Sequence, residues 1–376
     1  MIPYGKQSID ENDIRAVVEV LRSAWITQGP LVDEFEVRVA DYCGAKYGVA
    51  FNSGTSALHG ALFAAGIKPG DEVITTPLSF LATANAAVYL GARPVFVDIN
   101  QDNYCLDISR IEVAMTARTR AIIPVDYAGY PVDMERIIEI ARRHDLLVIE
   151  DAAHALGARR DGQILGSQAD MTMLSFHPVK HITTGEGGMI LCNDEEYYRR
   201  LKLFRSHGIT REPDCLERND GSWYYEMQEL GYNYRITDIQ CALGLSQLKK
   251  LDAFLGRRRQ IASLYDEVLG KLDWVKTPLS PPLGSSHAYH LYPLLLDPSI
   301  DRKKFYDYMR SRNIGVQVHY IPIHLQPYYH KMFGYRAGNF PLAEDFYARE
   351  ISLPIFPDLS QEEQAYVIDA IKTSKV

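Results

Sequence analysis

The chain has 376 residues, of which 47% are hydrophobic and 23% charged; this suits about two globular domains and excludes a disordered, collagen-like or coiled-coil protein. The formal net charge is −8, so the basic surplus of a protein that binds the nucleic-acid backbone is missing, and we expect no nucleic-acid partner. The N-terminus is polar and the chain has no apolar run of roughly 20 residues, so we expect neither a signal peptide nor a membrane span. The five cysteines are scattered and include no C-x-x-C pair, which predicts no disulfide framework, no metal site and a cytoplasmic protein.

Short β-branched segments alternate with amphipathic segments over the first two thirds of the chain. The predicted helices cover residues 10–23, 55–65, 81–90, 107–115 and 134–144. The predicted strands cover residues 47–51, 72–76, 93–97, 121–125, 146–150, 171–176 and 188–192. This order predicts an α/β fold with a large, mostly parallel sheet and helices on both faces.

The pattern changes after residue 205. Residues 211–223 are polar and irregular, which predicts a loop, and residues 236–269 predict one long helix or two consecutive helices. The proline-rich residues 278–282 predict a linker. The elements expected beyond it are strands at 291–296 and 316–319 and helices at 302–312 and 361–372. We therefore expect an N-terminal arm and large domain over residues 1–250 and a smaller α+β domain over residues 251–376.

Three common motifs are absent from the chain. It contains no G-x-x-x-x-G-K-[ST] and no G-x-S-x-G, and residues 185–188 (Gly-Glu-Gly-Gly) have the wrong spacing for G-x-G-x-x-G. These absences weigh against a nucleotide hydrolase and a Rossmann dehydrogenase.

A strand-to-helix turn at residues 52–58 (Asn-Ser-Gly-Thr-Ser-Ala-Leu) has the character of an anion cradle. Gly54 permits a tight turn, and Thr55 and Ser56 then stand at the helix start, where hydroxyls and free backbone N–H groups converge. The pattern favours a phosphate ligand, although an ordinary helix N-cap uses the same residue types.

The segment 148–154 (Val-Ile-Glu-Asp-Ala-Ala-His) places polar groups at the end of an apolar strand. Asp151 stands at the carboxyl end, where open α/β sheets bind their ligands. Its carboxylate needs a partner, either a protonated ring nitrogen or a structural arginine or helix N-terminus. His154 is able to donate to an oxygen of the same ligand or to serve as a satisfied core histidine.

Lys180 follows the strand at 171–176 and precedes a Thr/Gly-rich turn. A lysine in such a cleft loses solvent, which lowers its pKa and makes it a nucleophilic amine; the alternative is a solvated loop lysine. Ser175, at the strand end, has a hydroxyl that suits a phosphate.

These features together describe one ligand. A phosphate cradle, a carboxylate for a pyridinium nitrogen and a lysine for a Schiff base are what pyridoxal 5′-phosphate (PLP) requires. Phe80, in a further strand-end segment, supplies an aromatic plane to stack on the ring. All of these residues fall at predicted strand ends of one sheet, so the sequence predicts a PLP site.

The same segments also carry a family resemblance. The chain resembles the DegT/DnrJ/EryC1/StrS sugar aminotransferases nearly throughout, in order and at consistent spacing, in residues 52–58, 150–154, 175–180, 185–188 and 230–240. Residues 125–129, 175–180, 203–208 and 317–320 are most similar to the branch that makes UDP-4-amino-4,6-dideoxy-N-acetyl-β-L-altrosamine for pseudaminic acid. One departure is His181, where that branch more often has proline after the lysine.

The resemblance implies a PLP-dependent transferase of fold type I, with a large sheet domain, a smaller C-terminal α+β domain and a homodimer with two shared active sites. Lys180 would bind the cofactor covalently, Asp151 would pair with its ring nitrogen, and His154 would approach its phenolate oxygen. Phe80 would stack on the ring. The phosphate would be held by Thr55, Ser56 and Ser175, together with Asn233 of the other subunit. The sugar-nucleotide site would include Tyr4, Trp25, Ile26, Thr27, His319 and Tyr320.

The reaction implied is transamination from L-glutamate to the C4 keto group of a UDP-linked 4-keto-6-deoxy-N-acetylhexosamine. The alternatives are an aminotransferase for another nucleotide-linked keto sugar, at C3 or C4 and carried on dTDP or GDP, or a non-catalytic regulatory protein with a transaminase fold. A sugar 3-dehydratase of the same family would have histidine in place of Lys180.

Overall fold

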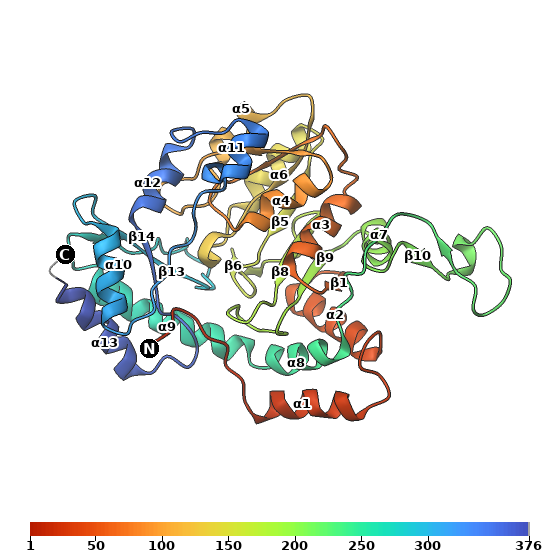
Figure 1. Ribbon diagram of the computed structural model, residues 1–376, viewed down its shortest axis with the longest axis horizontal. Helices are drawn as coiled ribbons and strands as arrows, with labels where there is room; N and C mark the ends of the chain where they lie inside the picture. The colour runs from red at the N-terminus through yellow and green to blue at the C-terminus, as the bar shows by residue number, and fades with distance from the viewer. Residues whose placement is uncertain (375–376) are drawn as a thin grey trace.

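The computed structural model describes residues 1–374 and has a seven-stranded sheet at its centre (Figure 1). Its strands lie in the spatial order β1 (Tyr47–Phe51), β9 (Gly188–Cys192), β8 (Met171–Ser175), β5 (Leu147–Asp151), β4 (Thr119–Ile123), β2 (Glu72–Thr75) and β3 (Arg93–Phe96). Strands β8 to β3 pair in parallel, and β9 is antiparallel to both β8 and β1. The predicted α/β fold with a mixed, mostly parallel sheet is confirmed.

The central strands are buried on both faces, which explains their nearly continuous apolar sequences. Alternate residues face opposite layers: Ile149 packs in the layer of α3 (Gly54–Ala64), and Val148 packs in the layer of α6 (Met134–Arg143). The first layer also includes α4 (Leu81–Tyr89) and α7 (Glu195–Arg205).

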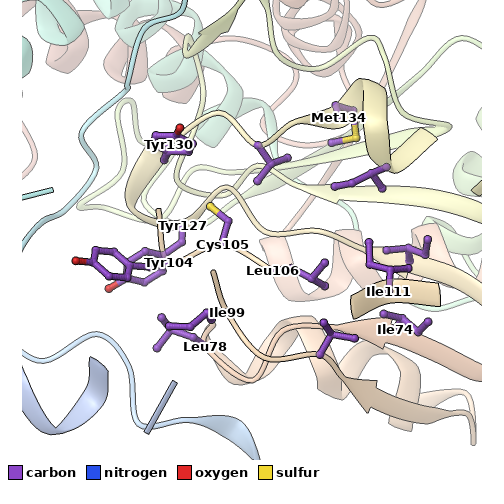
Figure 2. Packing of buried hydrophobic residues seen from close by; sticks show 14 of the residues in the cluster. Ile74, Leu78, Ile99, Tyr104, Cys105, Leu106, Ile111, Tyr127, Tyr130 and Met134 are labelled. Carbon is purple, nitrogen blue, oxygen red and sulfur yellow. The ribbon is translucent and has the colours of Figure 1, made fainter. Parts of the chain in front are cut away.

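The opposite layer has two parts. Near β9 it is formed by α2 (Pro30–Cys43), α8 (Asp238–Leu248) and the start of α9 (Leu251–Leu269). Near β2 it is formed by α6 and the loop region that contains η1 (Ile108–Arg110), α5 (Ile111–Ala114) and η2 (Tyr127–Gly129). Figure 2 shows this second part, where Ile74, Ile111 and Met134 belong to the same apolar cluster as Tyr104 and Tyr127.

A second, three-stranded antiparallel sheet is formed by β12 (Val275–Lys276), β13 (Tyr292–Leu296) and β14 (Glu350–Leu353). It packs with α9, α10 (Arg302–Ser311) and α13 (Gln361–Lys372). In contrast, three later elements pack against the large sheet: η4 (Ile323–Leu325), α11 (Pro327–Phe333) and α12 (Pro341–Arg349). The C-terminal third of the chain therefore contributes to both apolar regions, and the domain division at residue 250 stays a prediction.

The structure lacks one expected strand, and it has several helices and strands that were not expected; the unexpected strands are β6, β7, β10, β11, β12 and β14. Residues 316–319 form no strand; they make a single bridge, from Gln317 to Ser352 of β14. The helices that the sequence analysis did not anticipate are α2, α7, α11 and α12. The segment 236–269 forms two helices, α8 and α9.

Two further features surround this framework. Helix α1 (Glu11–Arg22) packs on α8, and the short strands β10 (Ile209–Thr210) and β11 (Glu226–Met227) bound a hairpin that projects from the body (Figure 1). The hairpin includes η3 (Pro213–Cys215), and a smaller hairpin joins β6 (Arg159–Arg160) to β7 (Gln163–Ile164). Within residues 1–374, no helix combines the length and apolarity needed to cross a bilayer.

Candidate active site

A cavity of about 700 Å³ opens at the carboxyl ends of β5 and β8, the place where open α/β sheets bind ligands. Its wall draws on the large sheet, on α3 and α4, and on the segment at 317–321. Nine of the residues expected from the sequence line it: Tyr4, Thr55, Phe80, Asp151, His154, Ser175, Lys180, His319 and Tyr320.

The N-terminus of α3 forms one end of the cavity. Ser53 caps the helix, and the backbone N–H groups of Gly54 and Thr55 have no acceptor among residues 1–374. A Cβ on Gly54 would lie 3.4 Å from the Cβ of Ser175, so glycine allows the end of β8 to approach the helix start closely. Free N–H groups and two hydroxyls, of Thr55 and Ser175, therefore face one space, which suits a phosphate.

Ser56 differs from the expectation that its hydroxyl faces the ligand. Its Oγ donates to the Oδ1 of Asn52 at 2.7 Å and accepts the backbone N–H of Ser53 at 3.1 Å. These bonds complete the N-terminal capping box of α3, and Ser56 is buried behind the cavity wall. In this structure the Ser56 hydroxyl shapes the turn rather than lining the cavity.

Asp151 is buried at the end of β5. Its Oδ2 accepts the hydroxyl of Thr83 at 2.7 Å, and its Oδ1 accepts the backbone N–H of Ala153 at 3.2 Å. Burial raises the pKa of this carboxyl, while its two donors and the nearby Lys180 oppose the rise. A cationic ring nitrogen in the cavity would favour the ionised form further.

Two more buried carboxyls lie behind Asp151. Burial, together with the neighbouring Glu150, raises the pKa of Asp126 well above its ordinary value, and burial raises the pKa of Glu150 to about 7. Thr172 donates to Glu150 at 2.8 Å, and the backbone N–H of Val132 donates to Asp126 at 3.0 Å. The raised pKa of Asp126 disfavours its ionised form, which limits the negative charge beneath the cavity.

Lys180 occupies the loop after β8, and its Nζ lies 3.3 Å from the Nε2 of His290. Burial lowers the pKa of the Lys180 amine to about 7, although the Asp151 carboxylate opposes this change. A substantial fraction of this amine is therefore neutral and nucleophilic near neutral pH.

His154 has one defined tautomer. The backbone N–H of Ala128 donates to its Nδ1 at 3.2 Å, so the proton of the neutral imidazole is on Nε2. Burial lowers the pKa of His154 well below its ordinary value, which keeps the ring neutral. Its Nε2 lies 3.1 Å from the hydroxyl of Tyr320, and both residues line the cavity, so the N–H lies at the wall where an oxygen of a ligand would compete with that hydroxyl.

Aromatic side chains form the outer wall of the cavity. Phe80 is 57% exposed and its ring centre lies 6.0 Å from that of Tyr320. The imidazole of His319 lies 5.2 Å from the ring of Tyr4 and 5.0 Å from the ring of Tyr320. This wall can pack against flat rings and the faces of a sugar.

Besides Ser56, four expected residues lie outside the cavity. Trp25, Ile26 and Thr27 are exposed in the loop between α1 and α2, and Asn233 is exposed beside the projecting hairpin. Within this chain the structure does not bring them to Lys180. Their roles toward a ligand stay predictions.

The residues that line the cavity fit PLP. The free N–H groups of α3 suit its phosphate, the buried Asp151 carboxyl suits a protonated ring nitrogen, and the neutral Nε2–H of His154 suits its phenolate oxygen. Lys180 supplies an amine of lowered pKa. These groups meet in one cavity of sufficient size.

Several groups of the site were not predicted from the sequence. Thr83 holds Asp151, the backbone of Ala128 sets the tautomer of His154, and His290 contacts Lys180. Thr83 lies on α4, three residues after Phe80, so a search for hydroxyls near the strand-end segments would have found it. His290 and Ala128 reach the site only through the tertiary fold.

Comparisons with known proteins agree with this site. The sequence profile described as the DegT/DnrJ/EryC1/StrS aminotransferase family matches residues 7–372. The spore coat polysaccharide biosynthesis protein SpsC of Bacillus subtilis is 41% identical, and a UDP-4-amino-4,6-dideoxy-N-acetyl-β-L-altrosamine transaminase of Campylobacter jejuni is 40% identical; each alignment covers 99% of this chain and 96% of the relative.

Solved structures show the same fold. PseC of Helicobacter pylori, an aminotransferase involved in the biosynthesis of pseudaminic acid, superposes with a TM-score of 0.92 at 35% identity. The PLP form of Spr1654 of Streptococcus pneumoniae, named as a putative sugar aminotransferase, gives a TM-score of 0.92 at 33% identity. Both superpositions cover 99% of this chain and 98% of the other.

Proposed function

Because the chain belongs to the DegT/DnrJ/EryC1/StrS aminotransferase family, and so is a PLP-dependent sugar aminotransferase, we propose that it transfers the amino group of L-glutamate to a UDP-linked 4-keto-6-deoxy-N-acetylhexosamine. The proposal is supported by the names of the Campylobacter jejuni relative and of PseC. It rests on one observation above all: Lys180, with its lowered pKa, shares a cavity with Asp151 and the N-terminus of α3.

PLP supplies an electron sink for the pair released when a Cα–H bond breaks. The chain's own groups make this possible. Asp151, held by Thr83, provides the anionic partner that keeps the ring nitrogen protonated. The N-terminus of α3 and the hydroxyls of Thr55 and Ser175 hold the phosphate end.

Lys180 moves the proton in the chemical step. Its neutral Nζ removes the proton from Cα of the donor as a general base and returns one as a general acid. A pKa of about 7 suits both roles at neutral pH, because each protonation state is then well populated. His290, 3.3 Å away, orients the amine when it is not bonded to the cofactor.

The proposed assembly is a homodimer in which each active site uses residues of both chains. Asn233 and residues 25–27 are exposed and lie outside the cavity of their own chain. A two-fold axis would repeat each contact reciprocally, so both cavities would gain the same additions. Under this proposal Asn233 of one chain reaches the phosphate bound by the other.

A substrate panel tests the proposed function. The purified enzyme is incubated with L-glutamate and UDP-, dTDP- or GDP-linked sugars that carry a keto group at C4 or C3, and 2-oxoglutarate and the amino sugar are quantified. We expect the highest kcat/KM, by roughly tenfold or more, with the UDP-linked 4-keto-6-deoxy-N-acetylhexosamine. Preference for another nucleotide, or for C3, would contradict the proposed acceptor while leaving the aminotransferase assignment intact.

A further inference from the structure

His319 is held at three points, although it lies outside any strand. Its backbone N–H donates to the Oε2 of Glu350 at 2.8 Å, and its carbonyl accepts the hydroxyl of Tyr127. Its ring Nδ1 lies 2.8 Å from the Oγ of Ser352. Because His319 also lines the cavity, its remaining ring nitrogen, Nε2, is the atom left for a ligand.

The contacts continue into a buried relay. The Oγ of Ser352 lies 2.5 Å from the Oε1 of Glu350. Glu350 and Ser352 stand two positions apart on β14, so their side chains leave the same face of the sheet, and both residues are completely buried. The relay therefore runs from Glu350 through Ser352 to His319, and ends at the cavity.

Only two arrangements of protons satisfy every group in this relay. With Glu350 ionised, Ser352 donates to the carboxylate, Nδ1–H of His319 donates to Ser352, and Nε2 presents a lone pair. With Glu350 protonated on Oε1, its O–H donates to Ser352, Ser352 donates to Nδ1, and Nε2 carries the proton. Ionisation thus shifts one proton along each bond and releases one proton from Nε2 to the cavity.

We propose that Glu350 and Ser352 are positioning residues that decide whether His319 presents a hydrogen-bond donor or an acceptor to the nucleotide sugar. The identity of the ligand rests on the proposed function, whereas the relay rests on the geometry alone. The donor form is complementary to a carbonyl or phosphate oxygen, and the acceptor form to a sugar hydroxyl. The relay therefore acts on acceptor binding rather than on the proton transfer by Lys180.

The groups around the relay define the pH range in which Nε2 of His319 changes from a donor to an acceptor. Burial raises the pKa of Glu350 to about 8, and the Arg302 guanidinium on α10 opposes the rise. Tyr127 and Tyr320 also face Glu350, and burial raises the pKa of both hydroxyls, so they stay neutral. Burial and the facing Lys180 lower the pKa of His319 to about 3, so its imidazole stays neutral. The donor form thus prevails below pH about 8 and the acceptor form above it.

Nuclear magnetic resonance of the PLP-loaded enzyme with ¹⁵N-labelled histidine tests the relay directly. The resonances of His319 are assigned with His319→Gln. We expect Nε2 of the wild type to change from a protonated to an unprotonated signal as the pH is raised through about 8. In Glu350→Gln the amide NH₂ takes the place of the O–H, so the Nε2–H form should persist at every pH. A wild-type tautomer that is constant with pH overturns the proposal.

Kinetics provide the second readout. We expect Ser352→Ala to raise KM for the nucleotide sugar about tenfold, with kcat little changed, and to abolish the pH dependence of KM near pH 8. Ser352→Thr keeps the hydroxyl and should restore both. The matched control is Glu344→Gln: Glu344 contacts His324 at 2.8 Å outside the cavity, so KM should be unchanged.

Different outcomes would contradict the proposed function and the proposed relay. If no nucleotide sugar is a substrate but the tautomer of His319 follows Glu350, the proposed function is wrong and the relay stands. If the enzyme acts on the sugar while Ser352→Ala and Ser352→Thr have equal KM values, the relay has no role in binding. If Glu350→Gln does not fold, the pair of Ser352 variants still decides between these outcomes.

Discussion

At the scale of single residues, the site shows how burial changes the chemistry of ordinary side chains. The same desolvation lowers the pKa of the Lys180 amine and raises the pKa of the Asp151 carboxyl. The two groups partly compensate, because each charge favours the ionised form of the other. Such opposed shifts in one cavity are typical of catalytic sites.

The lowered pKa of Lys180 leads to a testable pH dependence. The neutral amine is the nucleophile, so the rate at which the cofactor-free enzyme binds PLP covalently should rise as the pH increases through about 7 and then level off. Stopped-flow absorbance in the visible band of the lysine-bound cofactor measures this rate. Lys180→Ala, which should show no such band, is the control, and a midpoint near the ordinary lysine value of about 10.4 would contradict the shift.

Thr83 provides a second prediction. Thr83→Val removes the hydroxyl that donates to Asp151 without changing the size of the side chain, which should raise the pKa of Asp151 further and weaken its hold on the ring nitrogen. We expect the rate constant measured under single-turnover conditions to fall about tenfold, because one hydrogen bond to a charged group is lost. Thr83→Ser keeps the donor and should retain most of the rate; equal rates for the two variants would show that the contact is unimportant.

The site residues that could be predicted from the sequence are those that stand next to a recognisable local pattern, such as the end of a predicted strand. Lys180, Asp151 and Thr55 each follow a predicted strand, and all three line the cavity. The Ser56 hydroxyl bonds within the helix cap, and its role toward a phosphate stays a prediction, because the same residue types make a helix cap and a phosphate cradle. Glu350 gave no signal, because its partner His319 lies 31 positions away.

At the scale of elements, β9 and α3 approach each other very closely beside the site. A Cβ on Gly188, the first residue of β9, would lie 2.6 Å from the Cα of Gly54, closer than atoms can pack. Glycine at this position therefore lets the strand start lie directly against the helix start. The anion cradle depends on this contact between the two elements.

Gly188→Ala should separate these elements. We expect a loss of about 1–3 kcal/mol in the free energy of unfolding, measured by urea denaturation, together with weaker PLP binding. The control is Gly256→Ala on α9, where a Cβ would meet nothing within 4 Å; helix propensity should make this variant more stable by about 0.5–1 kcal/mol. Unaltered PLP affinity in Gly188→Ala would show that the cradle tolerates the displacement.

Elements with strong local signals were predicted well, and short ones were not. Residues 361–372 form α13 as predicted, because apolar periodicity and the capping box at Ser360 agree. Helices α11 and α12 were missed: they have seven and nine residues and are stabilised by packing on the large sheet. The expected strand at 316–319 has strand-forming residues. However, the backbone N–H of His319 donates to the carboxylate of Glu350 rather than to a neighbouring strand.

At the scale of the whole molecule, the proposed shared site predicts complementation between inactive variants. Lys180→Ala and a sufficiently damaging Asn233→Asp are mixed under conditions that allow subunit exchange. In a heterodimer one site receives both defects and the other receives neither, so activity should return to about half the wild-type rate per heterodimer.

Two controls make the complementation experiment decisive. Each variant alone must be inactive, and exchange must be verified with differently tagged chains. A mixture that stays inactive under these conditions would show that Asn233 acts within its own chain, and the shared-site proposal would be wrong.

The projecting hairpin also makes assembly visible by fluorescence. Of the three tryptophans, Trp223 is 71% exposed on this hairpin and Trp25 is 59% exposed, while Trp274 packs on the ring of Phe305. If these surfaces meet a second chain, dilution that separates the subunits should move the emission maximum to longer wavelength, since water then reaches both indoles. Trp223→Phe should remove a large part of that shift, which would make the hairpin an intrinsic reporter of association.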